Sequence, residues 1–245
     1  MFKPILLLLL SCVCIIVNAQ IRRVTTSPAT ISGQIPGYNQ VSTIATKTYS
    51  YTPSIPPTPP TPIDGDTTTE DDKRYRYADN MSVNINMADG NITNTSIGKV
   101  WTLRISIPNA LNIGFVFNQF NLSTIAKMYV FNEARTILDS GIKKANFSNS
   151  TEVGIFPIKG NSAILYIIEL NNFGNLLSSI AIQKLEAGFR EIDDVGDTGG
   201  QSQRASVNCN PHVQCQPGRM TSARAVARLV SNGGFGTGTM INNEI

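Results

Sequence analysis

Residues 101–107 read Trp-Thr-Leu-Arg-Ile-Ser-Ile, and residues 163–170 read Ala-Ile-Leu-Tyr-Ile-Ile-Glu-Leu. The first stretch alternates apolar and polar side chains, which predicts a half-buried β-strand that ends at Pro108-Asn109. The second stretch is apolar at consecutive positions, which is typical of a central strand covered on both faces. These two stretches predict a fold organised around β-sheet.

Further short apolar runs lie at 113–117, 128–131 and 179–185. Turn-forming residues separate these runs: Asp89-Gly90, Ser140-Gly141, Lys159-Gly160-Asn161 and Phe173-Gly174-Asn175. No long window repeats with a helical period. We therefore predict an all-β protein in which residues 77–189 form an antiparallel β-sandwich. Trp101 is expected in its core rather than at a ligand-stacking surface.

The first nineteen residues are typical of a secretory signal peptide. Lys3 precedes an apolar run over 5–17, and Ala19 ends a sequence suited to signal cleavage. The run is shorter than the ~20 apolar residues that a membrane-spanning helix needs. We assign residues 1–19 as a signal peptide cut after Ala19, and we expect a secreted, extracellular protein without a membrane partner.

Two stretches have the composition of linkers. Residues 20–76 are rich in Thr, Ser and Pro, and we expect a disordered linker there. For the Pro-rich stretch 48–72, a glycosylated stalk and a ligand for a Pro-binding domain are the alternatives. Residues 190–204 are acidic and glycine-rich, and they predict a processing linker that ends at Arg204, the expected cleavage site.

Charge and composition limit the kinds of site this chain can carry. Lys plus Arg is 20 and Asp plus Glu is 17, so the net charge is +3, which predicts no nucleic-acid partner. Cys209 and Cys215 are disulfide candidates for an oxidising compartment. Together with His212 they supply three metal ligands where a structural zinc site needs four, so we expect neither a metal nor a cofactor. Six Asn-x-Ser/Thr motifs are glycosylation candidates: Asn80, Asn91, Asn94, Asn121, Asn146 and Asn149.

The region after Arg204 carries a more specific signal. The cysteine pair is followed by Arg224-Ala225-Val226-Ala227 and then by residues 237–243, Thr-Gly-Thr-Met-Ile-Asn-Asn. This order resembles the opening of the mature enzyme in the lysyl endopeptidase family of secreted serine proteases. Residues 101–105, 127–131 and 187–190 are similar, in order, to stretches of that family's pro-region.

The resemblance implies a trypsin-like β-barrel enzyme that hydrolyses peptide bonds after basic residues, Lys above all. It implies that residues 205–245 are the truncated start of the protease domain, with polypeptide substrates and with the pro-region bound to its own enzyme. The family's catalytic His, Asp and Ser follow the Asn-Asn run, so no catalytic residue is assigned. A local bridge, an intermolecular bridge and free thiols all stay open for the two cysteines. The alternative to a protease precursor is a non-enzymatic secreted β-sandwich that binds glycans or proteins.

Overall fold

The computed structural model describes residues 21–25, 27–53, 75–147, 152–190, 226–231 and 234–239. Most of these residues are in strands, which confirms the all-β prediction. The described strands form two large sheets and one small sheet, and none of the three closes into a barrel. Within the described part of the chain, no helix is long and apolar enough to cross a membrane. The predicted signal peptide, residues 1–19, lies outside the described residues.

The larger sheet has seven strands, in the order β1-β9-β8-β11-β6-β2, with β5 also paired to β6. Its members are β1 (Arg22–Thr25), β2 (Ala45–Thr48), β5 (Asn91–Thr95), β6 (Gly98–Ser106), β8 (Ala126–Asn132), β9 (Ile137–Ile142) and β11 (Ser162–Leu170). One edge of β6 is shared, because β5 pairs antiparallel with its first half and β2 pairs parallel with its second half. The β2–β6 pair is the one parallel pair among the described strands.

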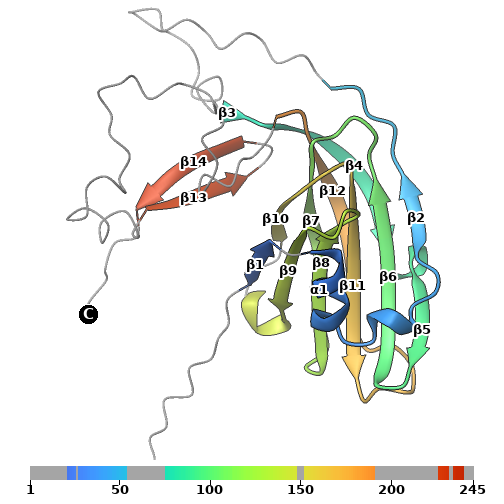
Figure 1. The fold of residues 1–245 in the computed structure, drawn as a ribbon. Coiled ribbons are helices and arrows are strands. Elements are labelled where there is room, and N and C mark those ends of the chain that lie inside the picture. The colour runs from blue at the N-terminus through green and yellow to red at the C-terminus, as the bar shows by residue number, and fades with distance from the viewer. Residues whose placement is uncertain are drawn as a thin grey trace, which may run out of the picture.

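The second sheet has four antiparallel strands, in the order β10-β7-β12-β4. Its members are β4 (Ala78–Asn86), β7 (Asn112–Asn121), β10 (Val153–Lys159) and β12 (Ser179–Gly188). Short 3₁₀ helices lie at η1 (Tyr38–Gln40), η3 (Met87–Asp89) and η4 (Lys144–Phe147). Figure 1 shows the strands of the larger sheet running side by side, with β4 and β12 behind β6 and β11.

The two sheets share one core, and the alternation in the sequence explains it. Trp101, Leu103 and Ile105 are fully buried on one face of β6 and belong to the same apolar cluster as Phe115 and Phe117 of β7. Burying each such side chain contributes roughly 1.5–3 kcal/mol before conformational entropy is counted. The expectation that Trp101 is a core residue is confirmed, and we refer to these two sheets as the two-sheet body.

The outer face of the larger sheet is covered by the N-terminal segment. On β11, Ile164, Tyr166 and Ile168 point away from the second sheet and pack with Ile31 of α1 (Pro28–Gln34) and with Ile35, the residue that follows this helix. Figure 1 shows α1 lying over β8 and β11. Strand β11 lies between β6 and β8, so the prediction of a central strand covered on both faces is confirmed.

The prediction of a disordered linker over 20–76 needs correction in its first half. Residues 22–48 contain β1, α1, η1 and β2, which belong to or pack on the larger sheet. Ile31 of α1 and Ile35, the C-cap residue just after it, are both buried, and the Ile35 N–H donates to the Ile31 carbonyl at 3.0 Å. The sequence of this segment is mostly polar, so it did not predict ordered structure. Its few apolar residues are nevertheless enough to pack the segment onto the larger sheet. Residues 54–74 lie outside the described part of the chain.

One predicted turn also needs correction. Ser140-Gly141 lies inside β9, where Gly141 has a φ of 78° and the register with β8 shifts. A glycine within a strand is as typical of a bulge as of a turn. The turns at Lys159-Gly160-Asn161 and Phe173-Gly174-Asn175 do separate strands, and these two predictions are confirmed.

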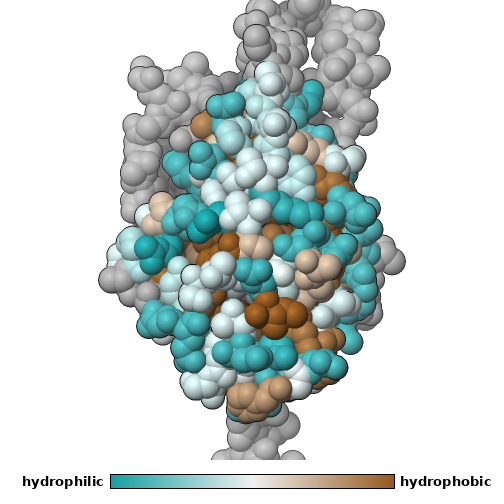
Figure 2. All heavy atoms as spheres, turned by 90° about the vertical axis from the view of Figure 1, so that its right-hand side faces the viewer, coloured by the Kyte–Doolittle hydropathy of each residue, from teal (hydrophilic) through white to brown (hydrophobic). Residues whose placement is uncertain are grey.

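One strand at the shared edge of β6, β5, carries an exposed apolar side chain. Figure 2 shows the side of the molecule that carries β2 and β5, where hydrophobic atoms form small patches among hydrophilic ones. On β5, Ile92 is 55% exposed while its neighbours Asn91 and Thr93 are polar. Single exposed apolar residues are normal on a protein surface.

The small third sheet contains β3 (Tyr75–Arg76), β13 (Val226–Ser231) and β14 (Gly234–Thr239). Strands β13 and β14 form an antiparallel hairpin with Val226 opposite Thr239. Strand β14 also pairs with β3, with Gly234 opposite Arg76 and Phe235 opposite Tyr75. The described part of residues 205–245 is therefore a hairpin that joins the two-sheet body through β3, the short strand just before β4.

Candidate functional site

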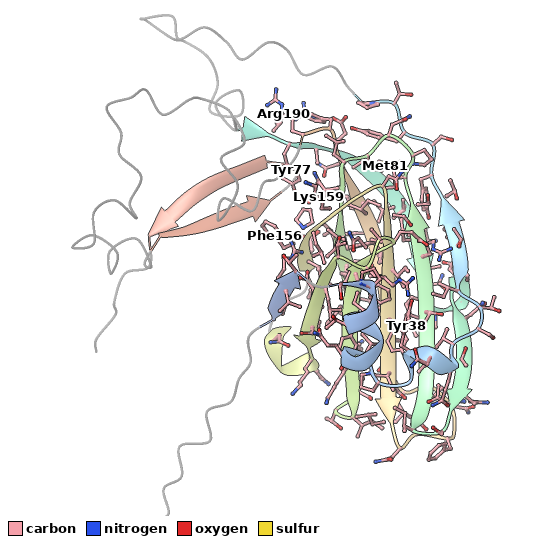
Figure 3. All side chains as sticks on the ribbon, viewed as in Figure 1. Tyr38, Tyr77, Met81, Phe156, Lys159 and Arg190 are labelled. Atoms are coloured by element: carbon pink, nitrogen blue, oxygen red, sulfur yellow. The ribbon has the colours of Figure 1, made fainter. Side chains whose placement is uncertain are left out.

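The candidate site is the end of the two-sheet body where the chain leaves it at Arg190, which we call the exit end. It is built from Arg76, Tyr77, Asn112, Gly188 and Arg190. Gly188, the last residue of β12, lies opposite Ala78 of β4 and opposite Asn112 of β7. Figure 3 shows Tyr77 and Arg190 at this end, next to β3.

Hydrogen bonds to the backbone hold the departing chain. The Tyr77 carbonyl accepts from the backbone N–H groups of Phe189 at 2.9 Å and Arg190 at 3.2 Å. The Asn112 side-chain amide donates to the Arg190 carbonyl at 2.7 Å. The Arg190 guanidinium donates to the Arg76 carbonyl at 3.2 Å. The stretch 187–190, which resembles part of the family's pro-region, is thus held through its own backbone and through the Arg190 side chain.

Close packing at Gly188 makes this attachment depend on glycine. A Cβ atom at Gly188 would lie 2.2 Å from the Asn112 Oδ1 atom. Asn112 is 3% exposed, and its Nδ2 atom is the donor to the Arg190 carbonyl. A side chain at position 188 would therefore displace the amide that holds Arg190.

Beneath the exit end lies a buried pair of polar groups. The Tyr77 hydroxyl donates to the Glu186 carboxylate, and both side chains are buried. Burial raises the pKa of Tyr77, and the negative charge and hydrogen bond of Glu186 raise it further. Tyr77 therefore stays a protonated donor near neutral pH, which suits a structural link between β12 and the residue before β4 rather than proton transfer.

A second polar link ties the N-terminal segment to the same end. The Asp79 carboxylate accepts from the Tyr51 hydroxyl at 2.9 Å and from the Arg76 guanidinium at 2.9 Å. Burial, followed by the hydrogen bond to Asp79, raises the pKa of Tyr51. Arg76 thus binds Asp79 through its side chain, binds Arg190 through its carbonyl, and pairs with Gly234 as part of β3.

The chain on either side of residues 191–225 is therefore linked to β3, directly at Arg190 and only through the β13–β14 hairpin at Val226. Arg190 is held by Tyr77 and Arg76, and β14 pairs with Tyr75 and Arg76. The predicted processing residue, Arg204, is within this interval and outside the described residues. A cut in this interval would leave the hairpin held to the two-sheet body by strand pairing alone.

The structure places five of the six glycosylation candidates on strands or in η4. Asn80, Asn94 and Asn121 are exposed, on β4, β5 and the end of β7, and Asn91 is half-buried on β5. Asn146 is half-buried in η4, and its side-chain oxygen accepts from the Lys143 N–H at 2.6 Å. The following predicted residues lie outside the described part of the chain: Ala19, Asn149, Arg204, Cys209, His212 and Cys215.

Neither a scan against protein-family models nor a search of the curated proteins finds a match to this chain. Among the described residues, no group of three or more His, Cys, Asp or Glu side chains is placed to hold a metal ion. Reasoning from sequence found residues 187–190 but missed Asn112, Tyr77 and Glu186. Glu186 carried a usable signal, because an acid inside a strand that is otherwise largely apolar must find a buried partner.

Proposed function

We propose that this chain is the N-terminal part of a secreted serine endopeptidase precursor similar to lysyl endopeptidases. In this proposal the two-sheet body is the pro-region, residues 191–204 are the processing segment, and the β13–β14 hairpin begins the enzyme. The reaction is hydrolysis of peptide bonds after basic residues through an acyl-enzyme, which follows from the resemblance. No residue of this chain is given a catalytic role.

The attachment of β14 to β3 is the observation that carries the proposal. Strands β13 and β14 form a hairpin where the resemblance implies the first hairpin of the enzyme. The pro-region supplies β3 as the strand that pairs with it. A hairpin on its own is marginally stable in water, and a third strand helps to stabilise it. The pro-region would therefore act as a template at which the first strands of the enzyme form.

Processing fits the same geometry. The chain is held firmly up to Arg190, and the acidic, glycine-rich stretch that ends at Arg204 follows. Exposed polar stretches that end in a basic residue are preferred sites of proteolysis. Cleavage after Arg204 would free Ala205 as the start of the enzyme, while β3 pairing would keep the two products together.

The test is to disrupt the gene in the source organism and compare the culture medium with that of the intact strain. We expect hydrolysis of a lysyl amide substrate to fall in the disrupted strain. The activity of the intact strain should be lost after treatment with a serine-directed organofluorophosphate. Unchanged hydrolysis after disruption, in a strain shown to secrete this protein normally, would refute the protease assignment.

A second candidate function is a secreted binding module. Phe173 is 67% exposed and Leu177 is 66% exposed, in the loop between β11 and β12 at the end opposite Gly188. Nearby, the Ser178 hydroxyl accepts from the Ser123 N–H, which brings the half-exposed Ile125 turn beside this loop. A cluster of exposed apolar side chains marks a protein-binding surface. Under this alternative, Phe173→Ser and Leu177→Ser would abolish partner capture, and gene disruption would leave lysyl amide hydrolysis intact.

A further inference from the structure

A cavity of about 510 Å³ lies on the outer face of the larger sheet, beside the C-terminal end of α1. Its floor comes from β8 and β9, and its walls come from Val24 of β1 and Gln34 of α1. The cavity lies on a different face from the core shared by the two sheets and is distinct from the exit end. Its volume is within the range of about 300–1,000 Å³ that small-molecule sites occupy.

Strand alternation explains which side chains line this cavity. Tyr129 belongs to the outer apolar cluster, so Lys127, two residues earlier on β8, faces the same side. On β9, Leu138 belongs to that cluster, and Ser140, two residues later, faces the same side of the sheet. Lys143, just beyond β9, completes the lining.

The cavity carries two positive charges and no negative one. Within the described residues, neither Lys127 nor Lys143 forms an ion pair with a carboxylate. The acidic residue nearest to Lys143 in sequence is Asp139. Its side chain lies on the other face of β9, where it accepts hydrogen bonds from the Arg23 guanidinium at 2.6 and 2.7 Å. Two ammonium groups beside one open hollow attract an anion, and added salt weakens this attraction because Lys143 is exposed to water.

Tyr129 adds a hydroxyl group to the lining of this cavity. Tyr129 is 7% exposed and lines the cavity, so its side chain is in reach of whatever occupies that space. Its neighbour Tyr166 donates to the Pro36 carbonyl at 2.7 Å. Burial raises the pKa of Tyr129, so the group remains a donor that a ligand oxygen could accept from.

We propose that this cavity binds an acidic monosaccharide, with its carboxylate between Lys127 and Lys143. The space is much larger than a lone carboxylate, so the ligand must carry additional atoms. Tyr129 and Gln34 bring a hydroxyl and an amide group that match sugar hydroxyls as donors and acceptors. The proposal does not depend on the protease assignment, because none of these residues belongs to the exit end.

The test is a titration of the full secreted chain with glucuronate, followed by calorimetry or by NMR of the ¹⁵N-labelled protein. We expect a millimolar dissociation constant that rises with salt. Lys127→Gln and Lys143→Gln should each weaken binding about fivefold or more, and Tyr129→Phe should weaken it about threefold. Lys144→Gln is the matched control, because Lys144 follows Lys143 in η4 and does not line the cavity.

Four outcomes would overturn the proposal. These are no glucuronate binding, glucose binding as tightly as glucuronate, acetate binding as tightly as glucuronate, and glucuronate binding that the three cavity variants leave unchanged. Equal acetate binding would mean that the lysines attract any small anion. The thermal midpoint of each variant is measured in parallel, so that a loss of binding in a folded variant is separated from unfolding.

Discussion

At the scale of single residues, buried polar groups connect loops and strands that the apolar core does not join. Glu169, at the end of β11, is fully buried and accepts hydrogen bonds from the backbone and hydroxyl of Ser178 and from the backbone of Leu177. At the exit end, the Asn112 side chain likewise holds the departing chain by donating to the Arg190 carbonyl. Each of these side chains fixes one loop or one departing chain, and each can be tested by a single substitution.

We expect Gly188→Ala to destabilise the chain by about 1–3 kcal/mol, because the added methyl group would collide with the Asn112 amide. Urea unfolding measures this change. Gly154→Ala is the control, since a Cβ atom at Gly154 would meet nothing within 4 Å. Equal stability of the two variants would mean that Asn112 does not hold Arg190 as described.

The pH dependence of stability should report on Glu169. Burial alone would raise the pKa of Glu169, but hydrogen bonds from Ser178, Leu177 and Asn172 outweigh burial and lower it from 4.5. A lowered native pKa means that Glu169 stabilises the fold above its unfolded pKa, and that this stability is lost as the pH falls through the native pKa. We expect Glu169→Gln to cost about 1–3 kcal/mol at pH 7.

The wild type and Glu169→Gln should then become closer in their free energy of unfolding as the pH falls below 4.5, the ordinary pKa of this carboxyl group. Urea unfolding at a series of pH values measures it. Glu152→Gln, at an exposed position, is the control and should leave the profile unchanged. A difference that widens toward acid would contradict the hydrogen-bond account of Glu169.

At the scale of elements, strands of the two-sheet body could be predicted where one or both faces are consistently apolar. Strands β6 and β11 follow the runs at 101–107 and 163–170, because burial and strand alternation leave a direct pattern in the sequence. Elements β1, α1 and β2 could not be predicted, since they are short and depend on packing against the larger sheet. Asn112 and the cavity also escaped prediction, because they join residues that are distant in sequence.

The attachment of β1 provides a prediction at this scale. The Arg23 guanidinium binds the buried Asp139 carboxylate and donates to the carbonyls of Phe156 and Pro157 on β10, at 2.9 and 2.8 Å. It thereby connects β1 and β9 with a strand of the other sheet. We expect Arg23→Gln to destabilise the chain by about 1–3 kcal/mol, because Asp139, 2% exposed, would lose its charged partner.

Thermal or urea unfolding measures the effect of Arg23→Gln. The comparison is Glu133→Gln, which breaks the ion pair with Arg104 on the surface, where Glu133 is 51% exposed. Exposed ion pairs contribute about 0–1 kcal/mol, so this control should change stability little. If Arg23→Gln is as mild as the control, β1 is not anchored through Asp139.

At the scale of the whole molecule, the described chain divides into a two-sheet body and a hairpin that meet at β3. The N-terminal segment covers the outer face of the larger sheet, and the chain leaves the body at the exit end, where Arg76, Tyr77 and Asn112 hold it. In the precursor we propose, the body is made first, holds the opening strands of the enzyme, and is separated from them by one cut after Arg204. The order of segments along the chain is then also the order of folding and release.

N-terminal sequencing of the secreted, processed product from the source organism tests this account most directly. The account predicts a mature chain that begins at Ala205, with a companion fragment that contains the two-sheet body and ends at Arg204. A mature chain that begins within residues 80–185 would cut through the two-sheet body, and it would contradict the assignment of that body as a pro-region.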